Sequence, residues 1–190
     1  MIPAWNMAGV IPPIQPGQPG HSPNRSPYFS TLTTLIDRFS LSPERVSILN
    51  GLFAYRSALH GLGLIEGFQW LDGSFLENIE DQETRPPKDI DVVTYFHLPA
   101  GVTQLLLHQK AGSLFDNDYV KKTYQVDAFL AILGEPVNAA SISRSTYWYS
   151  MWSHRRDGMW KGFVQIDLSP GEDTAALVIL TSKKTAIVTT

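Results

Sequence analysis

The chain has 190 residues, 43% of them hydrophobic, and its 15 Lys plus Arg against 18 Asp plus Glu give a net charge of −3. This length suits one ordinary domain with a conventional core, and the charge argues against a nucleic-acid coat driven by bulk electrostatics. The absence of cysteine excludes disulfide scaffolds, thiolate zinc sites, iron–sulfur clusters and cysteine nucleophiles.

The N-terminus has neither the basic region nor the apolar segment of a secretory signal. No stretch approaches the roughly 18 apolar residues that a spanning helix needs, so we expect a cytoplasmic protein with no membrane partner. Residues 1–28 hold most of the proline and predict an extended arm, followed by one domain over residues 29–190. The apolar Val10, Ile11 and Ile14 favour a strap laid over that domain, and the alternative is a loose tail.

Helix and strand signals alternate along the first half of the domain. Ser42-Pro43-Glu44 is typical of a helix start, and apolar residues at helical spacing behind it predict a helix of some eighteen residues. A strand over residues 68–71 should run into Asp72-Gly73-Ser74, and a second strand should cover residues 89–96. Residues 100–122 are expected to be helical, with a break at Gly112.

The second half continues the alternation. Residues 124–133 form the most apolar run and predict a central strand. Residues 139–153 predict a helix whose aromatic side chains belong to the core rather than to a cofactor site: Tyr147, Trp148, Tyr149 and Trp152. A strand over 162–168 and a helix over 172–183 follow. The order predicts an α+β domain in which helices flank a mixed sheet.

Two acids in the strand over residues 89–96 are the most informative feature. Side chains alternate along a strand, so Asp89 and Asp91 share one face about 6.6 Å apart. Carboxylates this close repel unless one is protonated or a cation lies between them, and a hard cation such as Mg²⁺ or Mn²⁺ suits oxygen ligands. The alternative is a solvent-facing strand end that carries two acids by chance.

Gly73 and Ser74 come at the end of the preceding strand, where a short helix over residues 75–79 can begin. Free amides at such a helix start attract phosphate. A phosphate site on one strand and a divalent-metal site on the next match what a reaction on a nucleoside triphosphate requires.

These residues resemble a known signature. Leu71-Asp72-Gly73-Ser74, fourteen intervening residues and then Asp89-Ile90-Asp91-Val92 are similar to the motif of the nucleotidyltransferase superfamily, which has the DNA polymerase beta-like fold. Segments 9–13, 67–75 and 87–93 resemble, more closely, a small bacterial family of uncharacterised nucleotidyltransferase-like proteins. The resemblance implies a nucleotidyltransferase-like mixed sheet, Mg²⁺ or Mn²⁺ as cofactor, an NTP substrate, and a third carboxylate from a later strand as base or metal ligand.

The third carboxylate has two candidates. Asp127 interrupts an apolar strand, where an ionised acid is costly unless a metal or hydrogen-bond donors compensate it. Asp167 shares its strand face with Lys161 and Gln165, so a solvated or salt-bridged role explains it more simply. Asp127 is therefore the preferred third acid and Asp167 the alternative.

The basic residues depart from the pattern of active superfamily members. The segment after Gly73-Ser74 lacks the basic residue that many active members carry, and Arg85 and Lys88 of the spacer loop are candidates to replace it. Arg155, Arg156 and Lys161, beside Trp160, form the best basic cluster for binding phosphate or stacking on a base. The alternative for both groups is an ordinary solvated surface.

Two functions follow from these residues. The first is an enzyme that uses Asp89, Asp91 and Asp127 with a divalent metal to move a nucleoside monophosphate from an NTP to an acceptor hydroxyl on a protein, an RNA or a small molecule. The second is a catalytically inactive binding or regulatory subunit with a protein partner or a second copy of itself, as in a toxin, antitoxin or defence pair. The missing basic residue, the low charge and the apolar arm support the second, and the enzyme is the preferred interpretation.

Overall fold

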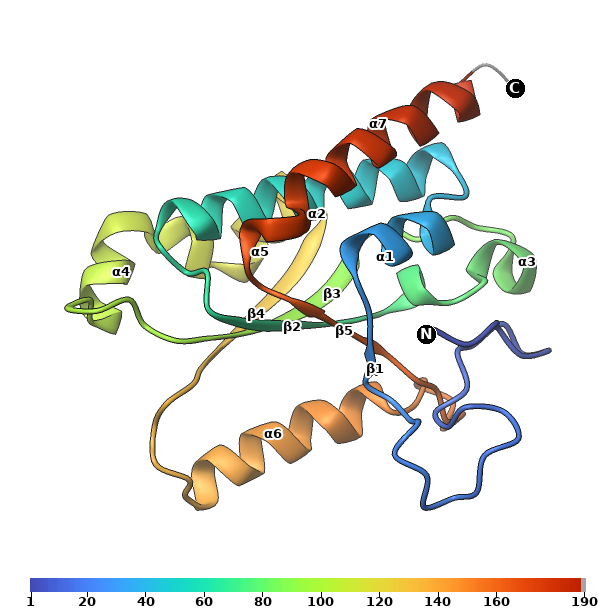
Figure 1. Cartoon of the computed structure of the whole chain (residues 1–190), viewed down its shortest axis with the longest axis horizontal. Helices are drawn as coiled ribbons and strands as arrows, with labels where there is room; N and C mark the ends of the chain where they lie inside the picture. The colour runs from blue at the N-terminus through green and yellow to red at the C-terminus, as the bar shows by residue number, and fades with distance from the viewer. Residues whose placement is uncertain (189–190) are drawn as a thin grey trace.

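The computed structural model describes residues 1–188, and within them seven α-helices surround a five-stranded mixed sheet, so the predicted α+β class is confirmed (Figure 1). The strands are β1 (Tyr28–Phe29), β2 (Gly67–Asp72), β3 (Ile90–Phe96), β4 (Val126–Ile132) and β5 (Val164–Asp167). The helices are α1 (Leu32–Phe39), α2 (Pro43–Gly61), α3 (Ile79–Glu83), α4 (Gln104–Ala111), α5 (Asn117–Tyr124), α6 (Ala139–Trp152) and α7 (Asp173–Val188).

The strands lie in the order β1-β5-β2-β3-β4. β2 runs antiparallel to both β3 and β5, whereas β4 is parallel to β3 and β1 is parallel to β5. The prediction that residues 124–133 form a central strand is wrong, because β4 lies at the edge of the sheet. Its apolar composition reflects cover on both faces, by α5 and α2 on one and by Trp148 of α6 against Phe129 on the other.

Helix α2 begins and ends where the sequence predicts. Ser42 accepts a hydrogen bond from the Arg45 amide, Pro43 occupies the first turn, and the helix ends at Gly61. The helical region predicted over residues 100–122 is divided into α4, a 3₁₀ turn that starts at Gly112, and α5. Helix α1 was not predicted, although its four buried side chains follow helical spacing: Leu32, Leu35, Ile36 and Phe39.

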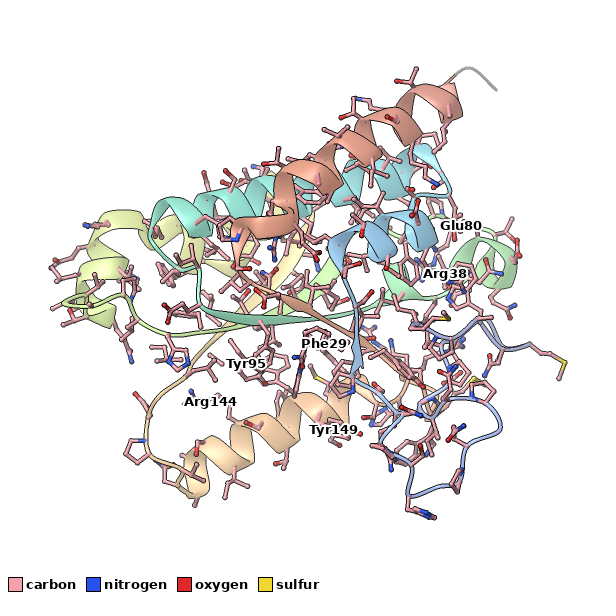
Figure 2. The ribbon with its side chains drawn as sticks, in the orientation of Figure 1. Phe29, Arg38, Glu80, Tyr95, Arg144 and Tyr149 are labelled. Atoms are coloured by element: carbon pink, nitrogen blue, oxygen red, sulfur yellow. The ribbon has the colours of Figure 1, made fainter. Side chains whose placement is uncertain are left out.

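The two faces of the sheet are covered differently (Figure 1). Helices α1, α2, α5 and α7 lie over one face, which we call the α2 face; there Arg56 donates to Gln69, which donates to Thr94. The other face of the sheet is turned toward α6, and we call it the α6 face. It carries Tyr95 of β3, and Figure 2 shows Tyr95 on the side of the sheet toward α6.

Helix α6 only partly fulfils the prediction that its aromatic residues belong to the core. Trp152 is buried and packs edge-on against Phe163. Tyr147 and Tyr149 are 58% and 36% exposed, whereas Trp148 between them packs against Phe129 and Trp152. Across residues 1–188, no helix combines the length and apolarity needed to cross a bilayer.

The N-terminal arm packs on the domain as a strap. Ile2, Val10 and Ile11 are buried. The Trp5 indole donates to the Leu76 carbonyl at 2.6 Å, and the Asn78 amide donates to the Gly9 carbonyl at 2.8 Å. The arm therefore covers the turn that follows β2, next to the predicted site.

Candidate functional site

Three carboxylates lie side by side across the sheet. Asp91 of β3 is in register with Asp72 of β2 on one side and with Asp127 of β4 on the other. Because side chains alternate along a strand, all three point to the α6 face, together with Trp70 and Tyr95. Asp89 lies one residue before β3. The predicted pair Asp89 and Asp91 is thus joined by Asp127, which β4 brings beside Asp91.

The alternative third acid lies elsewhere. Asp167 is exposed at the end of β5 and pairs with Phe68, at the opposite end of β2 from Asp72. Its carboxylate accepts from the Ser169 amide at 2.6 Å. Asp167 therefore has a local turn-forming contact and does not adjoin Asp91.

Gly73 closes the turn after β2 directly against Asp91. Its φ is +86°, and a Cβ at this position would lie 1.9 Å from the Asp91 Oδ2 atom. Only glycine allows the backbone to approach the carboxylate this closely in that conformation. The Gly-Ser turn and the Asp-x-Asp strand of the sequence motif are therefore in contact.

The prediction of a short helix over residues 75–79 is wrong. Ser74–Leu76 is a single 3₁₀ turn, and α3 begins only at Ile79. The buried Arg45 side chain donates to the carbonyls of Phe75 and Glu77, both at 2.6 Å, and so holds the chain in this irregular path. A turn this short lacks the aligned amides of a true helix start, so the helix-terminus argument for phosphate binding does not apply here. The role of Gly73 and Ser74 as phosphate ligands stays a prediction.

Burial and like charge act on the central carboxylates. Burial, with Asp127 and Asp89 adding repulsion, raises the pKa of Asp91 to about 6. Burial also raises the pKa of Asp72 to about 7, and it outweighs the attraction of Lys161. Both groups therefore favour a proton or a nearby cation more strongly than an exposed aspartate does.

Helix α5 supplies a cation, Lys121, that lies between Asp89 and Asp127. Lys121 Nζ is 2.5 Å from Asp127 Oδ2 and 3.0 Å from Asp89 Oδ2. Asn117, one helical turn earlier, donates to Asp127 Oδ1 at 2.8 Å. Its hydrogen bond to Asp127, and then Asp89, raise the pKa of Lys121, so its ammonium stays charged.

A second charged cluster lies beside Asp72. Lys161 is 5% exposed, and its Nζ lies 3.0 Å from Asp72 Oδ1 and 3.0 Å from Glu77 Oε1. Arg155 lies 3.9 Å from Glu77 and pairs with Asp157 at 2.8 Å. Of the predicted basic cluster, Lys161 and Arg155 are therefore engaged with acids of the chain, while Arg156 and the neighbouring Trp160 are exposed.

The two basic residues of the spacer loop, Arg85 and Lys88, have different surroundings. Arg85 pairs with Glu83 at 2.8 Å, and the two side chains are 42% and 45% exposed. Lys88 is exposed next to Asp89. Among the predicted phosphate ligands, Lys88 is thus the solvent-exposed cation that lies nearest in sequence to the carboxylates.

A model described as a family of unknown function (DUF6932) matches residues 3–167. The chain belongs to this family. No curated protein matches the DUF6932 chain, and no solved structure matches it. The family carries no activity with it, so the argument for function rests on the carboxylates.

The donor set of the DUF6932 chain suits a hard divalent cation. Within residues 1–188 no three His, Asp or Glu side chains converge as metal ligands do. The Lys121 ammonium lies between Asp89 and Asp127. With all groups ionised, the three carboxylates of Asp89, Asp91 and Asp127 and one ammonium carry a net charge of −2. All-oxygen ligands with that residual charge are what Mg²⁺ or Mn²⁺ prefers.

Sequence reasoning did not assign roles to Asp72, Asn117 or Lys121. Asn117 and Lys121 are four residues apart on α5, which puts both on one helix face, and this spacing was a usable signal. Asp72 lay inside the motif itself. Its position opposite Asp91 depends on the hairpin register, and nothing in the local sequence specifies that register.

Proposed function

We propose that this chain is a metal-dependent nucleotidyltransferase, which transfers a nucleoside monophosphate from an NTP to an acceptor hydroxyl. One observation carries the proposal: Asp91 is in register with Asp127 while the Gly73 backbone closes against the Asp91 carboxylate. The two halves of the sequence motif therefore meet at one place on the α6 face. The raised pKa of Asp91 supports it further, because a buried carboxyl repelled by two neighbours is stabilised by a cation.

Each residue has a role in this reaction. Asp89 and Asp91 would hold Mg²⁺ or Mn²⁺, which supplies charge neutralisation at the α-phosphate and at the leaving pyrophosphate. Asp127 accepts the proton of the attacking hydroxyl or binds the same cation. The bond from that hydroxyl oxygen to the α-phosphorus forms as the bond to pyrophosphate breaks. Gly73 keeps the backbone close to Asp91, so the turn after β2 adjoins the carboxylates.

The test follows α-labelled ATP, CTP, GTP and UTP in turn, with Mg²⁺ or Mn²⁺ and a cell lysate as the pool of acceptors. We expect wild type to place label on an acceptor and release pyrophosphate. Asp91→Asn and Asp127→Asn should each lose about 100-fold or more of this activity, because charge at the cation is removed while side-chain volume is kept. Asp167→Asn is the matched control and should retain it, since Asp167 lies at the far end of β2.

A second candidate is the inactive binding subunit, and the basic residues favour it. Lys161, Arg155 and Arg85 each pair with an acid of the chain, which leaves them less charge to offer a triphosphate. A nucleotide that binds and raises the melting temperature without release of pyrophosphate supports this role. A wild type whose melting temperature responds to neither metal nor any NTP contradicts the enzyme.

A further inference from the structure

Lys121 occupies the place in the carboxylate cluster where a cation is needed. Its Nζ contacts Asp127 and Asp89 at 2.5 and 3.0 Å, and these two acids come from different segments of the chain. The Lys121 side chain is 45% exposed, so its flexible stem can leave the acids for solvent without disturbing the core.

Asp127 is held by α5 through both of its oxygens. Asn117 donates to Oδ1 and Lys121 to Oδ2. Departure of Lys121 would free Oδ2 while Asn117 still fixes the orientation of the carboxylate through Oδ1. The two contacts are therefore unequal: a neutral amide positions Asp127, and the half-exposed Lys121 ammonium covers its remaining oxygen.

We propose that Lys121 is an intramolecular competitor of the divalent metal, which must displace this ammonium from Asp89 and Asp127 in order to bind. This inference rests on the proposed function. In this role Lys121 sets the concentration of Mg²⁺ or Mn²⁺ at which the carboxylate site becomes occupied. In the metal-free protein it reduces the repulsion among the three acids, and in the metal-bound protein it lies outside the metal site.

The test measures Mn²⁺ binding by calorimetry in wild type, Lys121→Met and Lys122→Met, without nucleotide. Lys122 is the matched control because it is the next residue on α5, is exposed, and changes the net charge equally. We expect Lys121→Met to bind Mn²⁺ at least about tenfold more tightly than wild type, since a competing positive charge within hydrogen-bond distance is gone. Lys122→Met should stay within about threefold of wild type, because it alters only long-range, screened charge.

Thermal unfolding gives a second readout. Without metal, Lys121→Met should melt below wild type, because the three acids lose their counter-ion, and Mn²⁺ should raise its melting temperature by more than it raises that of wild type. Circular dichroism confirms that the variant folds. Equal or weaker Mn²⁺ binding by Lys121→Met overturns the inference and leaves the enzyme proposal standing. If no variant and no wild type binds Mn²⁺, both fail together.

Discussion

The two faces of the sheet differ in how fully buried charge is compensated. On the α2 face, Arg56 is fully buried, and its guanidinium donates to both oxygens of Asp173 at 2.9 and 2.7 Å and to Gln69 at 2.7 Å. On the α6 face, Asp91 adjoins two further aspartates across the neighbouring strands, and burial together with the neighbouring acids raises its pKa to about 6.

The difference separates structural charge from charge that is available for chemistry. A buried ion pair whose every donor is used holds elements together but has nothing to offer a ligand. Excess negative charge in one place lowers stability, and folds keep such clusters mainly where a ligand compensates them. The α2 face therefore serves to fix the sheet, and the α6 face is where substrate is expected.

The largest effect on stability should come from removing the buried Arg56 guanidinium on the α2 face. Arg56→Met keeps an apolar stem but leaves Asp173 and the backbone carbonyls of Asp167 and Ser169 without this donor. We expect a loss of about 3–5 kcal/mol in the free energy of unfolding, measured by urea denaturation. Arg85→Met is the matched control, because its pair with Glu83 is exposed and should contribute below about 0.5 kcal/mol. Equal losses of unfolding free energy in the two variants would show that burial does not make the Arg56 ion pair more important than the exposed Arg85 pair.

A smaller effect is expected where the two motif segments touch. Gly73→Ala places a Cβ 1.9 Å from Asp91 Oδ2 at a φ of +86°, so we expect a loss of about 2–4 kcal/mol together with weaker Mn²⁺ binding. Gly17→Ala separates strain from collision, because Gly17 has a φ of +80° and a Cβ added there would meet nothing within 4 Å. It should lose only about 1 kcal/mol and leave Mn²⁺ binding unchanged. Similar losses of stability in Gly73→Ala and Gly17→Ala would show that the positive φ, and not the collision with Asp91, causes the effect.

The sequence predicted those parts of the fold that depend on local chemistry. Ser42 and Pro43 specify the start of α2, and the alternation of side chains along residues 89–96 specifies a strand with Asp89 and Asp91 on one face. Asp127 was found because an ionised acid in an apolar strand needs a partner, and the structure supplies Asn117 and Lys121. In each case the physical requirement could be read within a few residues.

The parts that were missed depend on contacts between distant segments. β4 resembles a central strand because apolar residues report cover by helices and not the number of hydrogen-bonded neighbours. Lys161 resembles a surface cation beside Arg155 and Arg156, but it is buried against Asp72 and Glu77, which lie more than eighty residues earlier. No local pattern encodes such a pairing.

The smallest expected effect concerns Asp72 and pH. Burial raises its pKa to about 7, whereas an unfolded aspartate titrates near 4, so between these values the native state holds a proton that the unfolded state has released. The stability from this group is complete below about pH 4 and is lost as the pH rises through about 7. Asp72→Asn keeps a neutral side chain that can still accept from Lys161. From pH 5 to pH 8, wild type should therefore lose on the order of 2–3 kcal/mol more than this variant in urea unfolding. The variant should retain part of the slope, because the pKa of Asp91 is also raised.

Asp118→Asn, which removes an exposed carboxylate from the first turn of α5, serves as the control and should follow the wild-type profile. If Asp72→Asn also parallels wild type across this range, Asp72 is ionised throughout, and the buried Lys161 ammonium, not a proton, balances it.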